Sequence, residues 1–320
     1  MVIPDLKIVI LCVIVILCTN AFAVITYIVK RNKTPQEAAA VAEEDEEIKT
    51  ISPSESGMKT VKIFTTNENC PYRVGSVHDI GRRNAQQDSF GVSDLEDEEA
   101  LTKKGFLAVV ADGMGGLSDG DRMSQIVVVN MLQGFDDASE SDPSPSVLMG
   151  LLDRATNEVN NDLGPDKLGK CGSTVVATII KDNLLSYISV GDSHIYVWRE
   201  GKLSKINRDH NYAAELDELV SRGEISVEEA MSDPQRAALT SFVGMGNLEM
   251  VDQNITPFEL HPRDRVLLMS DGVYGTLGDE KITELMNKPI RQSCILMDTE
   301  IRTINRKNQD NYTCVIIEIK

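Results

Sequence analysis

Residues 173–198 read STVVATIIKDNLLSYISVGDSHIYVW and have the composition of several consecutive β-strands. The stretch is rich in β-branched and aromatic residues, which are enriched in strands because they pack well on a pleated surface. Asp182-Asn183 separates two of the apolar runs, and Glu200-Gly201 follows the third. Such pairs favour two-residue hairpin turns because Asn, Asp and Gly tolerate a positive φ. We therefore expect neighbouring strands to be antiparallel and to form a meander.

Further runs of the same character lie on both sides of this stretch, at residues 72–78, 105–112, 265–270 and 312–319. Helical patterns occur between them, at residues 120–134, from 144 onward, and at 212–222, 279–287 and 291–305. Ser144 is expected to be the N-cap of the second helix, with Pro145 at its first helical position. Because strands and helices occur in separate blocks, the predicted fold class is α+β, without a strict βαβ alternation.

The composition of the chain limits the classes of protein to which it can belong. With 320 residues, of which 42% are hydrophobic and 26% charged, it can bury a full-sized core; this excludes a disulfide-stapled mini-protein and a mostly disordered chain. A net charge of −18 argues against nucleic acid as a partner. The six cysteines form no CxxC pair and the four histidines no HExxH pattern, so we expect reduced thiols and no histidine-built zinc site.

The N-terminal region carries one long apolar segment. Residues 8–29 contain no charged side chain and are long enough to cross about 30 Å of hydrocarbon as one transmembrane helix. Lys30, Arg31 and Lys33 follow, and such residues favour the cytoplasmic side of a membrane. We therefore expect residues 1–33 to be a single-pass anchor in the cell membrane, with the bulk of the chain cytoplasmic. A cleaved signal peptide and a buried core helix are the alternatives.

An acidic segment follows the anchor. Residues 34–60 carry seven acidic residues against two lysines, and no aromatic residue. Because this composition cannot bury enough apolar surface to fold alone, we expect a flexible linker. A short helix over residues 35–48 is the alternative, which would change only the reach of the linker. Residues 61–320 then form the globular domain.

Five aspartates share one setting at the ends of predicted strands. Each lies at the edge of an apolar run and next to Gly, Asn or Ser; they are Asp88, Asp112, Asp192, Asp271 and Asp310. A single aspartate in this setting is usually a turn residue that hydrogen-bonds its own backbone. Five in one domain favour a common site, where converging carboxylates would raise one another's pKa unless a cation neutralised them. Mg²⁺ or Mn²⁺ is the expected cation for oxygen ligands.

A pair of such ions would favour phosphoester hydrolysis as the reaction class. Two neighbouring divalent ions activate a bridging water and stabilise the oxygens of an in-line displacement at phosphorus. Arg82 and Arg83 precede Asp88, and a guanidinium can bind two phosphate oxygens at once. From composition alone, these arginines would more often be a solvated surface pair.

Six short strings occur in the order and approximate spacing of one enzyme family. They are GRRNAQQDSF (81–90), VVADGMGG (109–116), CGSTVVATII (171–180), YISVGDSHIYVWREGKLSKINRDH (187–210), MSDGVYGTL (269–277) and QDNYTCVII (309–317). Over residues 72–319 the chain resembles the metal-dependent serine/threonine protein phosphatases of type 2C (PPM), in their bacterial form. The resemblance implies a central sandwich of two antiparallel β-sheets flanked by α-helices, with a binuclear Mn²⁺ or Mg²⁺ centre at one end.

The resemblance also implies the metal ligands. By motif position, Asp112 would bridge the two ions. Asp88 and the carbonyl of Gly113 would hold one ion, and Asp271 with Asp310 would hold the other. All of these ligands would be oxygen atoms, as the residues themselves suggest.

Other positions match further parts of the family's site. Asp192 matches an aspartate that binds a third and looser metal in bacterial members, together with the aspartate of the Ser-Asp-Gly string, which is Asp271 in this chain. Arg83 lies where the family places its phosphate-binding arginine, whereas Thr174 and Asn311 are expected to support the site. The implied mechanism is direct attack of a metal-bound hydroxide on phosphorus, with Arg83 and Asp112 as the catalytic residues and no phosphoenzyme.

The chain departs from the family pattern at two positions. Met114 stands where many eukaryotic members have a histidine proposed as general acid, so the leaving group would take its proton from water or another residue. Gln87 replaces an acidic residue that helps through a coordinated water, and reduced metal affinity is expected. Residues 208–246 correspond to a mobile flap beside the active site, in which His210 is expected to be structural.

The sequence therefore predicts a membrane-anchored phosphatase facing the cytoplasm. Its partners would be proteins phosphorylated on serine or threonine and an opposing Ser/Thr protein kinase. The alternative is a pseudophosphatase that uses the same fold as a binding or sensor module. A metal-dependent hydrolase of a small phosphoester or a phosphodiester is the third hypothesis, and the negative charge disfavours its nucleic-acid version.

Overall fold

The computed structural model describes residues 61–64, 69–115 and 119–320. The predicted transmembrane helix at 8–29 and the predicted linker at 34–60 lie outside the described residues. Within the described ranges, none of the helices combines the length and the apolar character that a membrane span requires.

One sheet has six strands in the order β1-β2-β13-β12-β8-β9, and every pairing in it is antiparallel. The strands are β1 (Val61–Phe64), β2 (Tyr72–Asp79), β8 (His194–Arg199), β9 (Lys202–Lys205), β12 (Arg265–Met269) and β13 (Tyr312–Ile319). Strand β13 thus lies between β2, from the N-terminal part of the domain, and β12, from its C-terminal part.

The second sheet has seven strands, with the path β10-β7-β6-β4-β3; β11 also pairs with β7, and β5 with β4, all antiparallel. Its strands are β3 (Asp88–Val92), β4 (Phe106–Met114), β5 (Gly172–Ser173), β6 (Val175–Lys181), β7 (Leu184–Val190), β10 (Asp252–Gln253) and β11 (Phe258–Glu259). The antiparallel meander predicted for residues 173–198 is confirmed for β6 and β7, whereas β8 continues in the other sheet.

Both predicted hairpin turns are present. Lys181 pairs with Leu184 across the first hairpin, which leaves Asp182 and Asn183 as a two-residue loop with φ of 53° and 59°. The loop between β8 and β9 is Glu200-Gly201, with φ of 50° and 83°. Positive φ at both loop positions is the type I′ geometry, whose twist matches that of the flanking strands.

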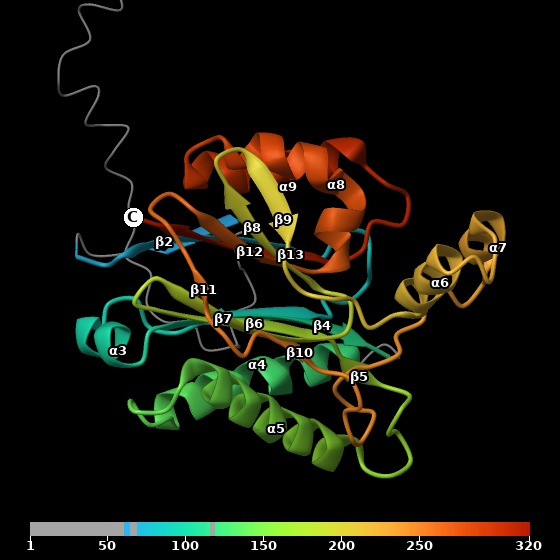
Figure 1. Cartoon of the computed structure of the whole chain (residues 1–320), viewed down its shortest axis with the longest axis horizontal. Coiled ribbons are helices and arrows are strands. Elements are labelled where there is room, and N and C mark those ends of the chain that lie inside the picture. Colours follow the sequence, from blue (N-terminus) through green and yellow to red (C-terminus); the bar gives the residue numbers. More distant parts are fainter. Residues whose placement is uncertain (1–60, 65–68, 116–118) are drawn as a thin grey trace, which may run out of the picture. The chain divides into compact units, whose positions relative to one another are not determined.

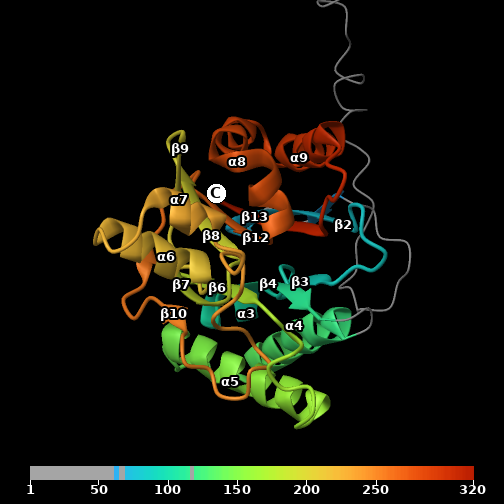
Figure 2. The same ribbon diagram turned by 90° about the vertical axis from the view of Figure 1, so that its right-hand side faces the viewer.

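The two sheets pack face to face and helices cover their outer faces (Figures 1 and 2). Alternate residues of each strand face opposite layers: Ala108 of β4 points into the core between the sheets, and Leu107 points toward α4 and α5. A third apolar layer joins the first sheet to α8 and α9. The covering helices are α4 (Gly120–Asp137), α5 (Ser144–Leu163), α8 (Asp271–Met286) and α9 (Ile290–Ile304). This confirms the predicted sandwich of two antiparallel sheets flanked by helices.

Three shorter helices complete the described fold: α3 (Glu98–Lys103), α6 (Tyr212–Ser221) and α7 (Val227–Ser232). In Figure 1, α6 and α7 lie beside one end of the sandwich and cover neither outer face. They belong to the segment predicted to form the flap.

Two helix starts differ from the prediction. Ser144 is the first helical residue of α5 and the extended Pro143 is its N-cap, so the predicted N-cap was wrong by one position. The helix predicted at 279–287 belongs to α8, which begins at Asp271 and is interrupted at Gly278, where φ is 72°. The turns before Gly278 were not predicted because the Ser-Asp-Gly at their start has the composition of a loop.

Candidate metal centre

Strand register brings the first two aspartates together. β3 begins at Asp88 and pairs with the end of β4 so that Asp88 lies opposite Asp112. The amide of Gly113 donates to the carbonyl of Gln87 at 3.0 Å, which extends the pairing by one residue. A Cβ at Gly113 would lie 1.9 Å from the carbonyl oxygen of Gly120, so only glycine fits here. The antiparallel ladder itself therefore sets the separation of the two carboxylates.

The Asp88 carboxylate is buried and joins the two sheets. Its Oδ2 accepts hydrogen bonds from the hydroxyls of Ser270 and Thr313, both at 2.7 Å. Ser270 directly precedes α8 and Thr313 lies in β13. The amide of Ser270 donates to the carbonyl of Thr313 at 3.0 Å, and the amide of Thr313 donates to the hydroxyl of Ser270 at 3.0 Å. The second oxygen, Oδ1, is buried without a hydrogen-bond partner among the described residues. A buried anionic oxygen without a donor is costly, so this atom requires a cation, a proton or water.

The main chain of Asp112 is held on both sides, which leaves its side chain for the site. Its carbonyl accepts from the amide of Thr174 at 2.8 Å and from the hydroxyl of Ser173 at 3.1 Å. Its own amide donates to the Thr174 hydroxyl at 3.1 Å, and that hydroxyl lies 2.8 Å from the Ser193 hydroxyl. Thr174 therefore holds the main chain of Asp112 through both its amide and its hydroxyl, in line with the supporting role expected for it.

Asp271 and Asp310 lie next to strands of the other sheet, Asp271 after β12 and Asp310 before β13. Asp271 is the first residue of α8, and its Oδ1 is buried without a hydrogen-bond partner in the described chain. Asp310 precedes β13, and its Oδ2 lies 2.5 Å from the guanidinium of Arg83. A Cβ at Gly272 would lie 1.9 Å from the carbonyl oxygen of Asn311, so this glycine allows the two loops to approach.

Asn311 joins the arginine loop to this part of the site. Its side-chain amide donates to the carbonyls of Ile80 and Ala85 at 2.8 and 3.0 Å, and its Oδ1 accepts from the amide of Gln87 at 2.8 Å. The loop that carries Arg83 is thereby fixed at both ends against the start of β13. Asn311 is thus a supporting residue, as predicted.

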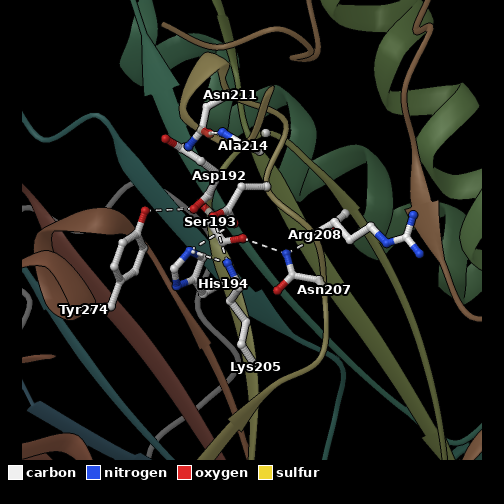
Figure 3. A network of polar contacts seen from close by, with 12 residues as sticks. Asp192, Ser193, His194, Lys205, Asn207, Arg208, Asn211, Ala214 and Tyr274 are labelled. Atoms are coloured by element: carbon white, nitrogen blue, oxygen red, sulfur yellow. Dashed lines mark hydrogen bonds and ion pairs between the residues drawn. The ribbon is translucent and has the colours of Figure 1, made fainter. Parts of the chain in front are cut away.

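Asp192 lies in the turn between β7 and β8 and is held mainly by side chains (Figure 3). The hydroxyl of Tyr274 donates to the carbonyl of Asp192 at 2.9 Å, and the Tyr274 ring stacks on His194 with centroids 3.5 Å apart. The side chain of Asn211 hydrogen-bonds the Asp192 carboxylate and also caps α6, where it accepts from the amide of Ala214 at 3.0 Å. Asp192 therefore contacts both α8 and the root of the predicted flap.

His210, near the start of the predicted flap, joins the flap to the same turn. Its amide donates to the carbonyl of Gly191 at 2.9 Å, and its Nδ1 accepts from the amide of Gly191 at 3.2 Å. Burial lowers the pKa of His210, which favours the neutral ring that this acceptor role requires. His210 is structural, as predicted.

The pKa shifts show that the carboxylates form one electrostatic group. Burial raises the pKa of Asp88 to about 6, and burial followed by repulsion from Asp310, Asp192 and Asp88 raises that of Asp271 to about 7. Burial also raises the pKa of Asp112 well above its ordinary value, and all four other aspartates add to this by repulsion. The structure therefore brings together the five aspartates that were predicted to converge.

The donor set fits hard divalent cations. Carboxylate oxygens that repel one another, two of them buried and unpartnered, favour a positive charge between them. Among the described residues, no three His, Cys, Asp or Glu side chains are spaced to hold one ion by themselves. Main-chain oxygens, such as that of Gly113, and water would therefore complete each shell, as is common for Mg²⁺.

Sequence reasoning missed the hydroxyls of Ser270 and Thr313 and the role of Tyr274. All three lie next to predicted ligands in the strings MSDGVYGTL and QDNYTCVII. Their position beside predicted ligands was the signal that the sequence offered for a role in the site. Which hydroxyl donates to Asp88, however, depends on how the two sheets pack. Gln87, predicted to contact a water, has its amide nitrogen buried without a partner in the described chain.

The comparisons with known proteins agree with this architecture. The sequence model of the family described as protein phosphatase 2C matches residues 77–304. The serine/threonine protein phosphatase PstP of Mycobacterium tuberculosis is 31% identical over 214 residues, which span 65% of this chain and 39% of that protein. The chain thus matches less than half the length of this relative.

Two further similarities extend over most of the partner's length. The serine/threonine phosphatase stp of Listeria monocytogenes is 28% identical over 247 residues, covering 75% of this chain and 93% of that protein. The crystal structure of the catalytic domain of PstP in complex with two manganese ions is 26% identical, with a TM-score of 0.61, and covers 78% of this chain and 98% of that one. The domain described here is therefore similar to a complete bacterial catalytic domain.

Proposed function

Since the chain belongs to the protein phosphatase 2C family, we propose that it is a metal-dependent phosphatase that hydrolyses phosphoserine and phosphothreonine on proteins. The observation that carries this proposal is the convergence of five carboxylates, in which one buried oxygen each of Asp88 and Asp271 has no hydrogen-bond partner among the described residues. The names of the relatives from M. tuberculosis and L. monocytogenes, both serine/threonine phosphatases, support the substrate class.

Mn²⁺ or Mg²⁺ is the proposed cofactor, with two ions and a looser third. Asp112 would lie between the two ions, with Asp88 and the Gly113 carbonyl on one side and Asp271 and Asp310 on the other. Asp192 would hold the third ion with Asp271. The two manganese ions named for the PstP catalytic domain support this assignment. When bound, the ions would neutralise the carboxylates, activate water and stabilise negative charge on the phosphoryl group.

The protein's own residues support direct attack by water. The hydroxyls of Ser270 and Thr313 both donate to Asp88, so neither is oriented as a nucleophile. Arg83 is half exposed at the edge of the site, and its guanidinium would bind the phosphate when Asp310 turns to a cation. Met114 offers no proton, so water or another residue would protonate the leaving seryl or threonyl oxygen.

Residues 1–33 are proposed to anchor the enzyme in the cell membrane, with the catalytic domain in the cytoplasm. The support is the uncharged stretch 8–29 and the basic residues that follow it. A flexible linker at 34–60 would raise the effective concentration of the enzyme near membrane substrates. Such an enzyme would oppose a Ser/Thr protein kinase.

A pseudophosphatase is the alternative function. Loss of ligand carboxylates would favour it, but all five are present and converge. A binding module would not need five repelling carboxylates at one place. We therefore favour the enzyme.

Phosphate release from a phosphothreonine peptide tests the proposal. Full-length protein in detergent is assayed with Mn²⁺, with Mg²⁺ and with a chelator, beside Asp271→Asn and the matched control Asp153→Asn, an exposed aspartate on α5. We expect metal-dependent release by the wild type and the control, and none by Asp271→Asn. Absence of release from folded wild-type protein under every metal would favour the pseudophosphatase.

A further inference from the structure

Three exposed cations lie in the loops that carry Arg83 and Asp310, and they have no part in the site described above. They are Arg82, Arg306 and Lys307, here called the basic rim. No ion pair links any of the three to another described residue. In a chain with a net charge of −18, cations that have no ion pair among the described residues, next to the arginine proposed to bind phosphate, suggest an anionic ligand.

Backbone and side-chain contacts hold the basic rim at the edge of the site. The amide of Arg82 donates to the carbonyl of Gln309 at 2.9 Å, and the Arg82 guanidinium donates to the side chain of Asn305. The amide of Gln309 donates in turn to the carbonyl of Arg306 at 3.2 Å. Because Gln309 precedes Asp310, the loop that carries Arg306 and Lys307 is joined directly to a proposed metal ligand.

Among the residues that the structure describes, no acidic side chain pairs with the basic rim. Asp79 and Asp298 are both paired with Arg302, at 2.6 and 2.9 Å, and Asp310 is paired with Arg83. The nearby carboxylates are thus already used by other cations. A group with two negative charges, such as a phosphate, would find unused donors here.

We propose that the basic rim binds a second phosphate group on the same substrate segment, a few residues from the phosphoserine or phosphothreonine that is hydrolysed. This inference rests on the proposed function, because it places the scissile phosphate at Arg83. Its consequence is a preference for multiply phosphorylated segments. An anionic lipid surface is the competing ligand, and the experiment separates the two.

The test compares two peptides of one sequence, carrying either one phosphothreonine or a second one three residues away. For the full-length protein in detergent with Mn²⁺, we expect a kcat/KM about tenfold higher on the doubly phosphorylated peptide. In Arg306→Ala/Lys307→Ala this preference should fall to about twofold, mainly through KM, with the singly phosphorylated peptide little changed. Because the preference is a ratio within one preparation, a smaller folded fraction does not alter it.

The matched control is Lys288→Ala/Arg291→Ala, which removes the same charge at the opposite end of α9, about 20 Å away. It should keep the wild-type preference. An equal loss in the control, or no loss in the rim variant, would overturn the inference. So would an unchanged peptide preference in a rim variant whose turnover, unlike that of the wild type, no longer responds to vesicles with anionic lipid. Absence of metal-dependent release from either peptide would overturn the proposed function, whereas equal release from both would overturn the basic rim alone.

Discussion

The two halves of the candidate centre are built in different ways. Asp88 and Asp112 are opposite residues of a β-ladder, and Asp88 also accepts hydrogen bonds from two hydroxyls on the side of the other sheet. Asp192 lies in a turn and is held by side chains of α8 and of the flap root. The first half is therefore positioned by main-chain pairing inside the core, and the second by a few contacts with shorter elements.

This difference predicts that substitutions in the two halves will affect activity and stability to different degrees. A ladder of buried hydrogen bonds opens only with much of the fold, whereas a turn held by side chains can shift at small cost. Changes in the Asp88–Asp112 half should therefore abolish activity or reduce stability. Changes around Asp192 should reduce activity by smaller factors and leave the fold intact.

Asp112→Asn should have the largest effect. Because every other aspartate of the group repels Asp112, a cation among them depends most on this charge, and we expect turnover to fall by about a thousandfold or more. Phosphate release from a phosphothreonine peptide measures the loss. Asp153→Asn on α5 serves as the control, and near-normal turnover by Asp112→Asn would contradict the ligand assignment.

Thr313→Val tests the hydroxyls that join the sheets. The substitution removes a donor to the buried Asp88 carboxylate and should destabilise the protein by about 1–3 kcal/mol, measured by urea unfolding with a chelator. Thr178→Val is the matched control, because the Thr178 hydroxyl is buried without a partner in the described chain. Equal stability of the two variants would show that the hydroxyl of Thr313 does not support Asp88.

Stability without metal should fall as pH rises from 5 to 8. Burial raises the folded-state pKa of Asp88 to about 6, and burial and carboxylate repulsion raise that of Asp271 to about 7. Carboxyls of the unfolded chain titrate near pH 4, so between these values the folded protein binds more protons and loses stability as they leave.

The melting temperature in chelator measures this dependence. We expect Tm to be roughly 3–10 °C higher at pH 5 than at pH 8. Asp271→Asn should reduce the difference, and saturating Mn²⁺ should stabilise the protein most at pH 8. A Tm that rises with pH in chelator would contradict the uncompensated group of carboxylates.

Tyr274→Phe should have the smallest effect, since it removes one hydroxyl and keeps the ring on His194. Loss of the bond to the Asp192 carbonyl should lower turnover by about three- to tenfold with little change in Tm. Tyr187→Phe is the control, because its hydroxyl makes a similar bond to the Ile206 carbonyl. A thousandfold loss in Tyr274→Phe would mean that the Asp192 half is as critical as the other.

Local chemistry made much of the fold predictable. The β-branched runs and the Asp-Asn and Glu-Gly pairs are short-range signals, and they correspond to β6 to β9 with both turns in place. The start of α8 was missed because Ser-Asp-Gly has the composition of a loop, and in the structure the Ser270 hydroxyl donates to Asp88 in the other sheet instead of capping the helix. That choice depends on sheet packing, which no local pattern contains.

The site shows the same limit. Aspartates beside Gly, Asn or Ser at strand ends are visible in the sequence, and family resemblance added the position of Arg83. Two features of the site follow only from the folded arrangement. One is which carboxylate oxygens have no partner among the described residues, and the other is that Asn211 both caps α6 and contacts Asp192. The sequence therefore predicted which aspartates gather, and the structure shows how differently they are held.

Binding of Mn²⁺ to the full-length protein, followed by isothermal titration calorimetry, tests most directly whether the gathered carboxylates form a metal centre. We expect two ions bound to the wild type, a weaker third, and loss of the pair in Asp112→Asn. Absence of Mn²⁺ binding by folded wild-type protein, or the same stoichiometry and affinity in Asp112→Asn, would contradict it.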